Sequence, residues 1–349
     1  MDLGKDGQSH SQASGREQTE GKRLLDQCRA LFEDDKLFQA VRAERALALL
    51  DHELHVREDD FLSKVRAAGD EAMQARTDLQ AGEDWTLVRE GSHEGDCRVW
   101  YRPETGTAIH SLRVSADIEA PLEYLLVLLN EVHLFNQWLP FIGESRTLLR
   151  FQRCAQFAWV KVISPAALLL HHRDACLECR AIDGLDEDGC VLVIIKSDEP
   201  SEQGSQGRHY ECPNGGDRTV RVDVKKGAIR LEPLKNGGTR ITAVFNVDPK
   251  LQRLPAWLIN WVAQKVCYVG MWQFDRHARR IARGTEDCAH RRAIRENADF
   301  YDWVIGRVHA CVPKIFAKSY FGGEEATEVD SLETHAAAAG ANLRGAAEI

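Results

Sequence analysis

The chain has 349 residues, a formal net charge of −9 and an isoelectric point near 5.8. Its length allows one large domain with additions, or two domains. Its acidity argues against a nucleic-acid partner, which requires a basic surface to displace counterions. No apolar run approaches the ~18 residues of a membrane span, and the polar N-terminus has no apolar signal core. Ten cysteines without framework spacing indicate reduced thiols, as in a cytoplasmic protein.

Two polar or helical segments precede the main domain. Residues 1–20 are rich in Gly, Ser, Gln and charged side chains, a composition typical of disorder. Residues 21–82 place apolar side chains such as Leu24, Leu31 and Leu47 at three-to-four spacing, which predicts two or three helices, compatible with a hairpin.

From Trp85 to Asp248 the apolar pattern changes to period two, which predicts strands. The parity of one run changes past Lys226-Gly227, which indicates a bulge or a bend. Asp188-Gly189 and the segment 236–238 (Asn-Gly-Gly) lie between strand runs as hairpin turns. The strand at 190–195 is apolar on both faces, so its second face needs a cover, for which the N-terminal helices are available.

A long helix follows the strands and begins at Leu254-Pro255, where proline suits the first helical turn. Its apolar residues fall on nearly every face, which is typical of a helix that is buried or covers an apolar space. Polar residues interrupt it too often for a membrane span. The order of elements therefore predicts an α+β fold, in which a curved antiparallel sheet wraps around the C-terminal helix and encloses a hydrophobic cavity.

Four loose motifs, in order, carry a family resemblance over residues 83–284. They are Trp85 with Gly95–Arg102; the helix from Pro121 followed by Asn136–Pro140 (NQWLP); Val162–Pro165 with His172-Arg173-Asp174; and the helix start LPAWLINW. This arrangement resembles the START domain, the steroidogenic-acute-regulatory-related lipid-transfer module with a helix-grip fold. The resemblance implies non-enzymatic binding of a lipid, such as a phospholipid, sterol or sphingolipid, in an enclosed cavity. It also implies transient contact with a membrane surface, hence a cytoplasmic protein that is peripheral at membranes.

Candidate site residues follow from the strand faces and the last helix, together with the resemblance. The predicted lipid-binding residues are Leu112, Val114, Trp138, Trp159, Arg173, Trp257, Leu258, Trp261 and Val262.

Residues 168–174, just before and at the start of a predicted strand, carry two further predictions. Neighbours on a strand point to opposite faces, so Arg173 is expected to face inward and Asp174 outward or toward a local partner. Arg173 then contacts a head group or anchors the fold. Leu168, Leu169 and Leu170 are the predicted membrane-contact residues, and the alternative is that they fold back and plug the entrance.

Other motifs carry less chemistry. Cys176 and Cys179 have the spacing of a metal pair, but no second ligand pair appears, so neither a metal nor another cofactor is expected. Residues 285–320 are predicted to be a helical extension with an amphipathic stripe that packs on its own domain or lies on a membrane. Residues 321–349 are expected to be disordered.

Two alternatives to lipid binding and transfer, or sensing, remain at this stage. One is a helix-grip enzyme of the aromatase/cyclase type, for which His110 is the one candidate acid–base residue on an inward strand face. The other is an interaction protein with a vestigial cavity, whose N-terminal helices bind a partner.

Overall fold

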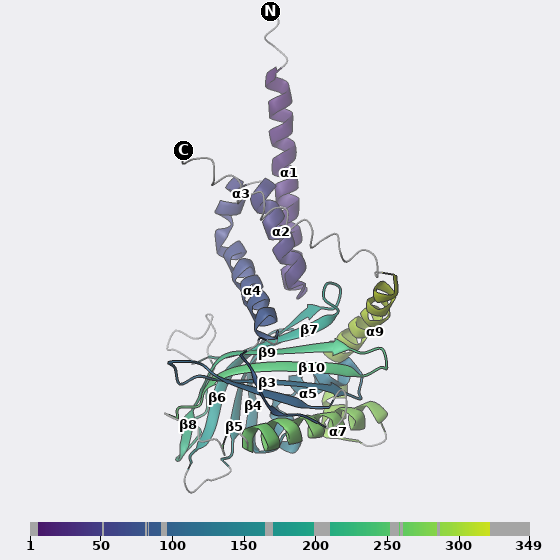
Figure 1. Ribbon diagram of the computed structural model, residues 1–349. Coiled ribbons are helices and arrows are strands. Elements are labelled where there is room, and N and C mark those ends of the chain that lie inside the picture. The colour runs from purple at the N-terminus through teal and green to yellow at the C-terminus, as the bar shows by residue number, and fades with distance from the viewer. Residues whose placement is uncertain are drawn as a thin grey trace, which may run out of the picture.

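A computed structural model describes residues 6–50, 52–80, 82, 84–91, 96–164, 170–198, 210–251, 258, 261–284 and 287–321. A ten-stranded sheet forms its centre (Figure 1). In chain order the strands are β1 (Thr86–Arg89), β2 (Arg98–Pro103), β3 (His110–Ile118), β4 (Ile142–Gln152), β5 (Ala155–Val162), β6 (His172–Gly184), β7 (Cys190–Ser197), β8 (Thr219–Arg221), β9 (Asp223–Pro233) and β10 (Thr239–Asp248).

The sheet is antiparallel in the order β1-β2-β3-β10-β9-β7-β6-β5-β4, with short β8 added parallel to β6. The bulge predicted near Lys226-Gly227 is confirmed, because Asn246 pairs with Lys226 whereas the next residue, Val247, pairs with Val224. The hairpin turns predicted at 188–189 and 236–238 connect β6 to β7 and β9 to β10. The period-two alternation of apolar residues therefore predicted both the faces of the strands and the position of the bulge.

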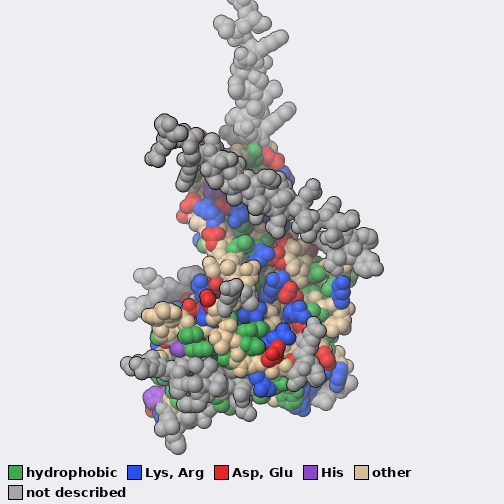
Figure 2. All heavy atoms as spheres, viewed as in Figure 1, with side chains coloured by type: hydrophobic (Ala, Val, Ile, Leu, Met, Phe, Trp, Pro, Cys, Tyr) green, Lys and Arg blue, Asp and Glu red, His purple; other side chains and the backbone are tan. Residues whose placement is uncertain are grey.

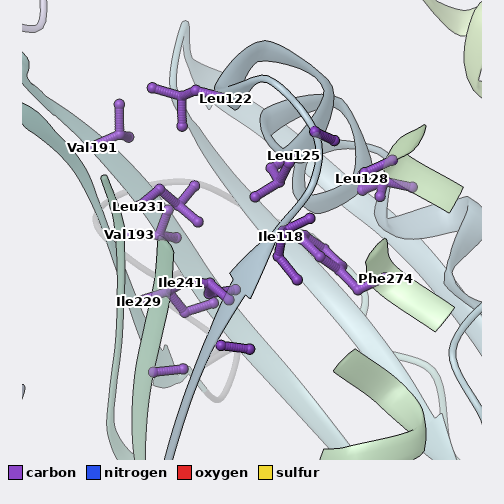
Figure 3. Close-up of a cluster of buried hydrophobic side chains, with 14 of the residues drawn as sticks. Ile118, Leu122, Leu125, Leu128, Val191, Val193, Ile229, Leu231, Ile241 and Phe274 are labelled. Atoms are coloured by element: carbon purple, nitrogen blue, oxygen red, sulfur yellow. The ribbon is translucent and has the colours of Figure 1, made fainter. Parts of the chain in front are cut away.

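Helices cover the inner face of the sheet. They are α5 (Leu122–Asn130), the 3₁₀ segment η1 (Val132–Gln137), the π-helical segment η2 (Val262–Tyr268), α7 (Val269–Arg283), α8 (Ala289–Glu296) and α9 (Ala298–Phe321). Alternate side chains of β3, β7, β9 and β10 meet α5 and α7 in one buried cluster (Figure 3). Phe274 of α7 is fully buried there, beside Leu125 and Leu128 of α5. The observed fold class is thus α+β, with an antiparallel sheet packed against α7, the long helix that follows its last strand.

The N-terminal helices project from the outer face at the middle of the sheet, and they contact it through α4 and the start of α2 (Figure 1). They are α1 (Asp6–Glu33), α2 (Leu37–Leu50), α3 (His52–Arg57) and α4 (Asp59–Asp78). Ala72 and Ala75 of α4 pack on Leu192 and Ile194 of β7, as expected for a strand that is apolar on both faces. Helix α1 begins at Asp6, well before residue 21. The helix therefore includes residues 6–20, for which the composition predicted disorder, and a nucleated helix extends at low cost even through polar residues.

The C-terminal helix α9 packs on the domain. Tyr301, Val304, Val308 and Cys311 are buried along one stripe of it. Its Arg307 pairs with Asp183 in the β6–β7 hairpin, and that carboxylate also accepts a hydrogen bond from Lys36 Nζ at 2.9 Å, between α1 and α2. The two terminal additions therefore converge on one turn of the sheet. The predicted tail beyond residue 321 lies outside the described residues.

Three further expectations from the sequence concern membrane spans, metal ligands and cysteines. No helix among the described residues is long and apolar enough to cross a membrane, and no group of potential metal ligands occurs among them. Cys176 of β6 and Cys212 form a disulfide, however, so the expectation that all ten cysteines are reduced is wrong. No local pattern predicts this pair, because the 36 residues that separate the two cysteines contain two strand segments and a long connection.

Candidate functional site

An apolar cavity of about 260 Å³ lies at one end of the inner face of the sheet. Because neighbouring strands are antiparallel, the starts of β3 and β6 meet the ends of β5 and β10 at this edge. The residues that line it are Tyr101, His110, Leu112, Val162, Ile163, Ser164, Leu170, His171, Arg173, Val247, Pro249, Leu251, Leu258, Trp261, Val262 and Val266.

The helical wall of the cavity follows from the spacing of its residues. Leu258, Trp261, Val262 and Val266 recur at three-to-four spacing and so share one helix face, which here faces the strand ends. The Trp261 ring packs edge-on against Phe141, with 4.6 Å between centroids. The backbone of η2, which carries Val262 and Val266, is π-helical, a conformation found frequently at functional sites.

Arg173 is the charged residue on the described cavity wall. Its guanidinium donates hydrogen bonds to the backbone carbonyls of Pro249, at 3.0 Å, and of His171 and His172. No carboxylate of the described residues lies within ion-pair distance of it, and burial lowers the pKa of Arg173. The cavity therefore holds a cation that backbone carbonyls position but that no acid neutralises.

Tyr101 and His110 add a second polar group to the wall. The Tyr101 hydroxyl and His110 Nδ1 share a hydrogen bond of 2.7 Å between adjacent strands, and the two rings are stacked. Burial lowers the pKa of His110 and raises that of Tyr101. Both groups are thereby held in their neutral forms at neutral pH, as suits an apolar cavity.

Asp174 faces the opposite side of the sheet from Arg173, as strand alternation predicts. Its side chain is 2% exposed and accepts two hydrogen bonds of 2.8 Å from Arg221 and one of 2.9 Å from Trp159 Nε1. Burial opposes ionisation, but these hydrogen bonds outweigh it and lower the pKa of Asp174. This outer-face ion pair leaves Arg173 without its sequence neighbour as a partner.

The structure brings together part of the predicted site. Leu112, Arg173, Leu258, Trp261 and Val262 line the cavity, as does Leu170 of the predicted membrane-contact residues.

Three predicted residues lie elsewhere, for different reasons. Val114 is one residue pair farther along β3, past the cavity and inside the filled core. Trp138 packs between Phe135 and Phe274 in that core, at the other end of α7. Trp159 pairs with Cys176 across β5 and β6 and shares its outer face with Asp174, so the alternation of β5 points it away from the cavity.

Three others, Trp257, Leu168 and Leu169, lie outside the described residues. The prediction also missed several lining residues, including Tyr101, Val162, Val247 and Pro249. All of them lie at strand ends on one sheet edge. The pairing of strands that are far apart in sequence brings them together, so only the topology could have identified them.

A second apolar cavity lies between α5, α9 and β5–β7, and its volume is about 100 Å³. Small-molecule sites usually have volumes of roughly 300–1,000 Å³. The cavity at the strand ends approaches this range, whereas the cavity under α9 is well below it. The former is therefore the candidate ligand site.

Comparison with solved structures agrees with this architecture. The human StAR-related lipid transfer protein 5 superposes with a TM-score of 0.51, at 16% identity, over 62% of this chain and 96% of its own. This chain has the START-like helix-grip fold. Human STARD10 has a TM-score of 0.48 at 18% identity, over 60% of this chain and 78% of its own. A STAR-related lipid transfer protein from Xanthomonas axonopodis has a TM-score of 0.43 at 19% identity, over 56% of this chain and 99% of its own.

The sequence itself has no such counterpart, since neither a protein-family model nor a curated protein sequence matches it.

Proposed function

We propose that this protein binds one lipid-like molecule in the cavity at the strand ends and carries it between membranes or reports its presence. The observation on which the proposal rests is the cavity itself. It is an apolar space between sheet and helix, with a single described cation on its wall. The START-like fold supports this proposal by analogy alone, because one fold can host unrelated functions.

Desolvation would provide the binding energy. At roughly 30 Å³ per group of the size of a water molecule, the 260 Å³ cavity holds on the order of nine methylene-sized groups. Each buried methylene contributes about 0.8 kcal/mol, so such a chain would gain about 7 kcal/mol on leaving water. A longer lipid chain would require the cavity to widen.

The polar end of the ligand would lie against Arg173, and possible ligands are a phospholipid, a sphingolipid or a sterol. A guanidinium whose present partners are backbone carbonyls still has donors for the oxygens of a phosphate or carboxylate. The Tyr101–His110 pair offers neutral hydrogen-bonding groups for a hydroxyl or a carbonyl. A ligand with one polar end and an apolar body would match both parts of this wall.

Transfer would need contact with a membrane, and Leu168, Leu169 and Leu170 remain the proposed contact. Leu170 lines the cavity, and this supports the proposal. We therefore propose that the protein is cytoplasmic and binds transiently to membrane surfaces.

The proposal is tested by placing a charge on the helical wall. Val262→Asp puts a carboxylate among the apolar residues of the cavity wall, where a charge is costly to bury against the apolar body of a ligand. We expect the variant to fold and to lose uptake of a fluorescent fatty acid, measured with purified protein in the absence of vesicles. The matched control is Val56→Asp on α3, where the valine is exposed.

The control should bind like the wild type. A folded Val262→Asp protein with unchanged uptake would contradict ligand binding in this cavity. Circular dichroism and thermal melts of both variants separate loss of binding from loss of folding.

One observation supports a second candidate function, an enzyme on the helix-grip scaffold. His110 lies on the cavity wall and is hydrogen-bonded to Tyr101, the kind of pair that transfers a proton to or from a bound carbonyl compound. Incubation of the protein with its co-purifying ligand tests this alternative. A product whose formation stops in His110→Gln, while binding persists, would favour the enzyme.

A further inference from the structure

A second, cationic cleft lies at the far end of α7 from the cavity. It has a volume of about 820 Å³ between the segment Asn136–Pro140, which begins in the last two residues of η1, and the exposed side of α7. Arg276, His277, Arg280 and Arg283 line its helical wall. In a chain with a net charge of −9, this local concentration of positive charge is unexpected.

The charge of α7 is only partly compensated. Its four arginines face one acidic residue of the same helix, Asp275, which pairs with Arg279, as does Glu119. Arg276 and Arg283 have no carboxylate within ion-pair distance among the described residues. Two guanidinium groups of the cleft are therefore available to an anion.

A buried donor points to the same conclusion. Trp138 is 4% exposed and lines the cleft, yet its indole Nε1 has no hydrogen-bond partner in the described structure. A buried N–H without an acceptor is costly, so such groups are rare unless a ligand completes them. The ring lies 6.3 Å from that of His277, centroid to centroid, in the floor of the cleft.

An exposed aromatic residue next to the cleft indicates where the anion comes from. Trp272 of α7 is 53% exposed, and the Arg276 guanidinium lies over its ring at 5.5 Å. Tryptophan is enriched at the level of lipid head groups, and arginine near a bilayer surface is attracted to anionic lipids. Basic side chains appear over the lower part of the domain, where α7 lies, in Figure 2.

We propose that the cleft between the Asn136–Pro140 segment and α7 binds the phosphate of an anionic phospholipid in a bilayer, with Trp272 inserted at the head-group level. Arg276 and Arg283 would neutralise the charge of the phosphate, and an opening of the cleft around Trp138 would let its buried indole N–H donate to a phosphate oxygen. This site is separate from the lipid cavity, and it would dock the protein on acidic membranes through the far end of the helix that closes that cavity.

Vesicle sedimentation with the full chain tests the proposal. Phosphatidylcholine vesicles with phosphatidic acid should bind the protein, those without it should not, and added salt should weaken binding because it screens exposed charges. The double variant R276Q/R283Q should bind on the order of thirtyfold more weakly, at about 1 kcal/mol for each arginine near an anionic surface. The matched control is R98Q/R240Q, which removes the same charge from ion pairs on the outer face.

Trp138→Phe keeps an aromatic ring in the core and removes the five-membered ring with its N–H. Loss of one hydrogen bond to a charged group should weaken binding roughly tenfold. Trp272→Ala changes an exposed residue and therefore tests the docking face even if the Trp138 variant is unstable.

Unchanged vesicle binding by R276Q/R283Q would overturn the proposal, and so would an equal loss in R98Q/R240Q, which would indicate attraction by overall charge alone. Binding of soluble glycerol 3-phosphate without binding of vesicles would overturn the membrane as the source of the phosphate. Val262→Asp should retain vesicle binding, so failure of this site and failure of the cavity are distinguishable.

Discussion

Arg173 and Arg221 allow a matched test of what each guanidinium does. They lie on opposite faces of the sheet, and Asp174, the sequence neighbour of Arg173, pairs with Arg221. Arg221→Met would leave the Asp174 carboxylate, 2% exposed, with Trp159 as its remaining partner among those described here. Removing one member of a buried ion pair typically costs about 3–5 kcal/mol, so this variant should be strongly destabilised.

Arg173→Met should behave differently. It loses hydrogen bonds to the carbonyls of Pro249, His171 and His172, each worth about 1 kcal/mol net, but it also removes a half-buried cation whose desolvation is unfavourable, which offsets part of that loss. We therefore expect a loss of about 1–2 kcal/mol in the free energy of unfolding. Urea unfolding, followed by circular dichroism, measures both variants against the wild type.

Ligand discrimination provides the second measurement. A fluorescent fatty acid and the fatty alcohol of the same chain length differ in the charge at their polar end. If Arg173 contacts that end, the wild type should prefer the acid, and Arg173→Met should lose roughly ten- to hundredfold of this preference, the value of one hydrogen bond between charged groups. A variant destabilised as strongly as Arg221→Met, with an unaltered preference, would refute a head-group role and identify Arg173 as a structural anchor.

Two other perturbations have defined outcomes. His290 of α8 is 4% exposed, and burial, followed by the nearby His277 and His133, lowers its pKa to about 4 from 6.5. Because the unfolded state then binds the proton more readily, stability should be unaffected above pH ~6.5 and fall by about 3 kcal/mol as the pH drops to ~4. Between pH ~6.5 and ~4, the free energy of unfolding of His290→Gln in urea should fall by about 3 kcal/mol less than that of the wild type. An identical pH dependence in both proteins would contradict the lowered pKa of His290. Replacing Leu168, Leu169 and Leu170 by Ser should slow transfer between vesicles while equilibrium binding persists, measured by fluorescence dequenching; loss of binding with transfer per bound lipid unchanged would instead indicate a plug.

Much of the fold could be predicted because local patterns determine it. Alternation identified the strands and even the bulge opposite Asn246, and turn residues located the hairpins. The helix that carries Leu258 and Trp261 was recognisable because it is apolar on nearly every face. These features depend on residues close together in the sequence.

The site was predictable only in part, because side-chain direction and strand pairing decide it. Trp159 is as apolar as Leu112, but it lies on the face of β5 that carries the Asp174–Arg221 pair. Trp138 belongs to a motif of the START resemblance, yet it packs in the core and lines the cationic cleft. Tyr101 reaches the cavity because β2 pairs with β3. Neither composition nor period contains that information.

Native mass spectrometry of the purified full-length protein tests the central claim most directly. After exposure to a lipid extract and removal of the vesicles, the wild type should carry one apolar molecule per chain, identifiable by its mass. Val262→Asp should appear without it, and Val56→Asp should retain it. A wild-type chain that remains empty, or a Val262→Asp chain that carries the same molecule, would contradict a lipid held in the cavity between the strand ends and the helix.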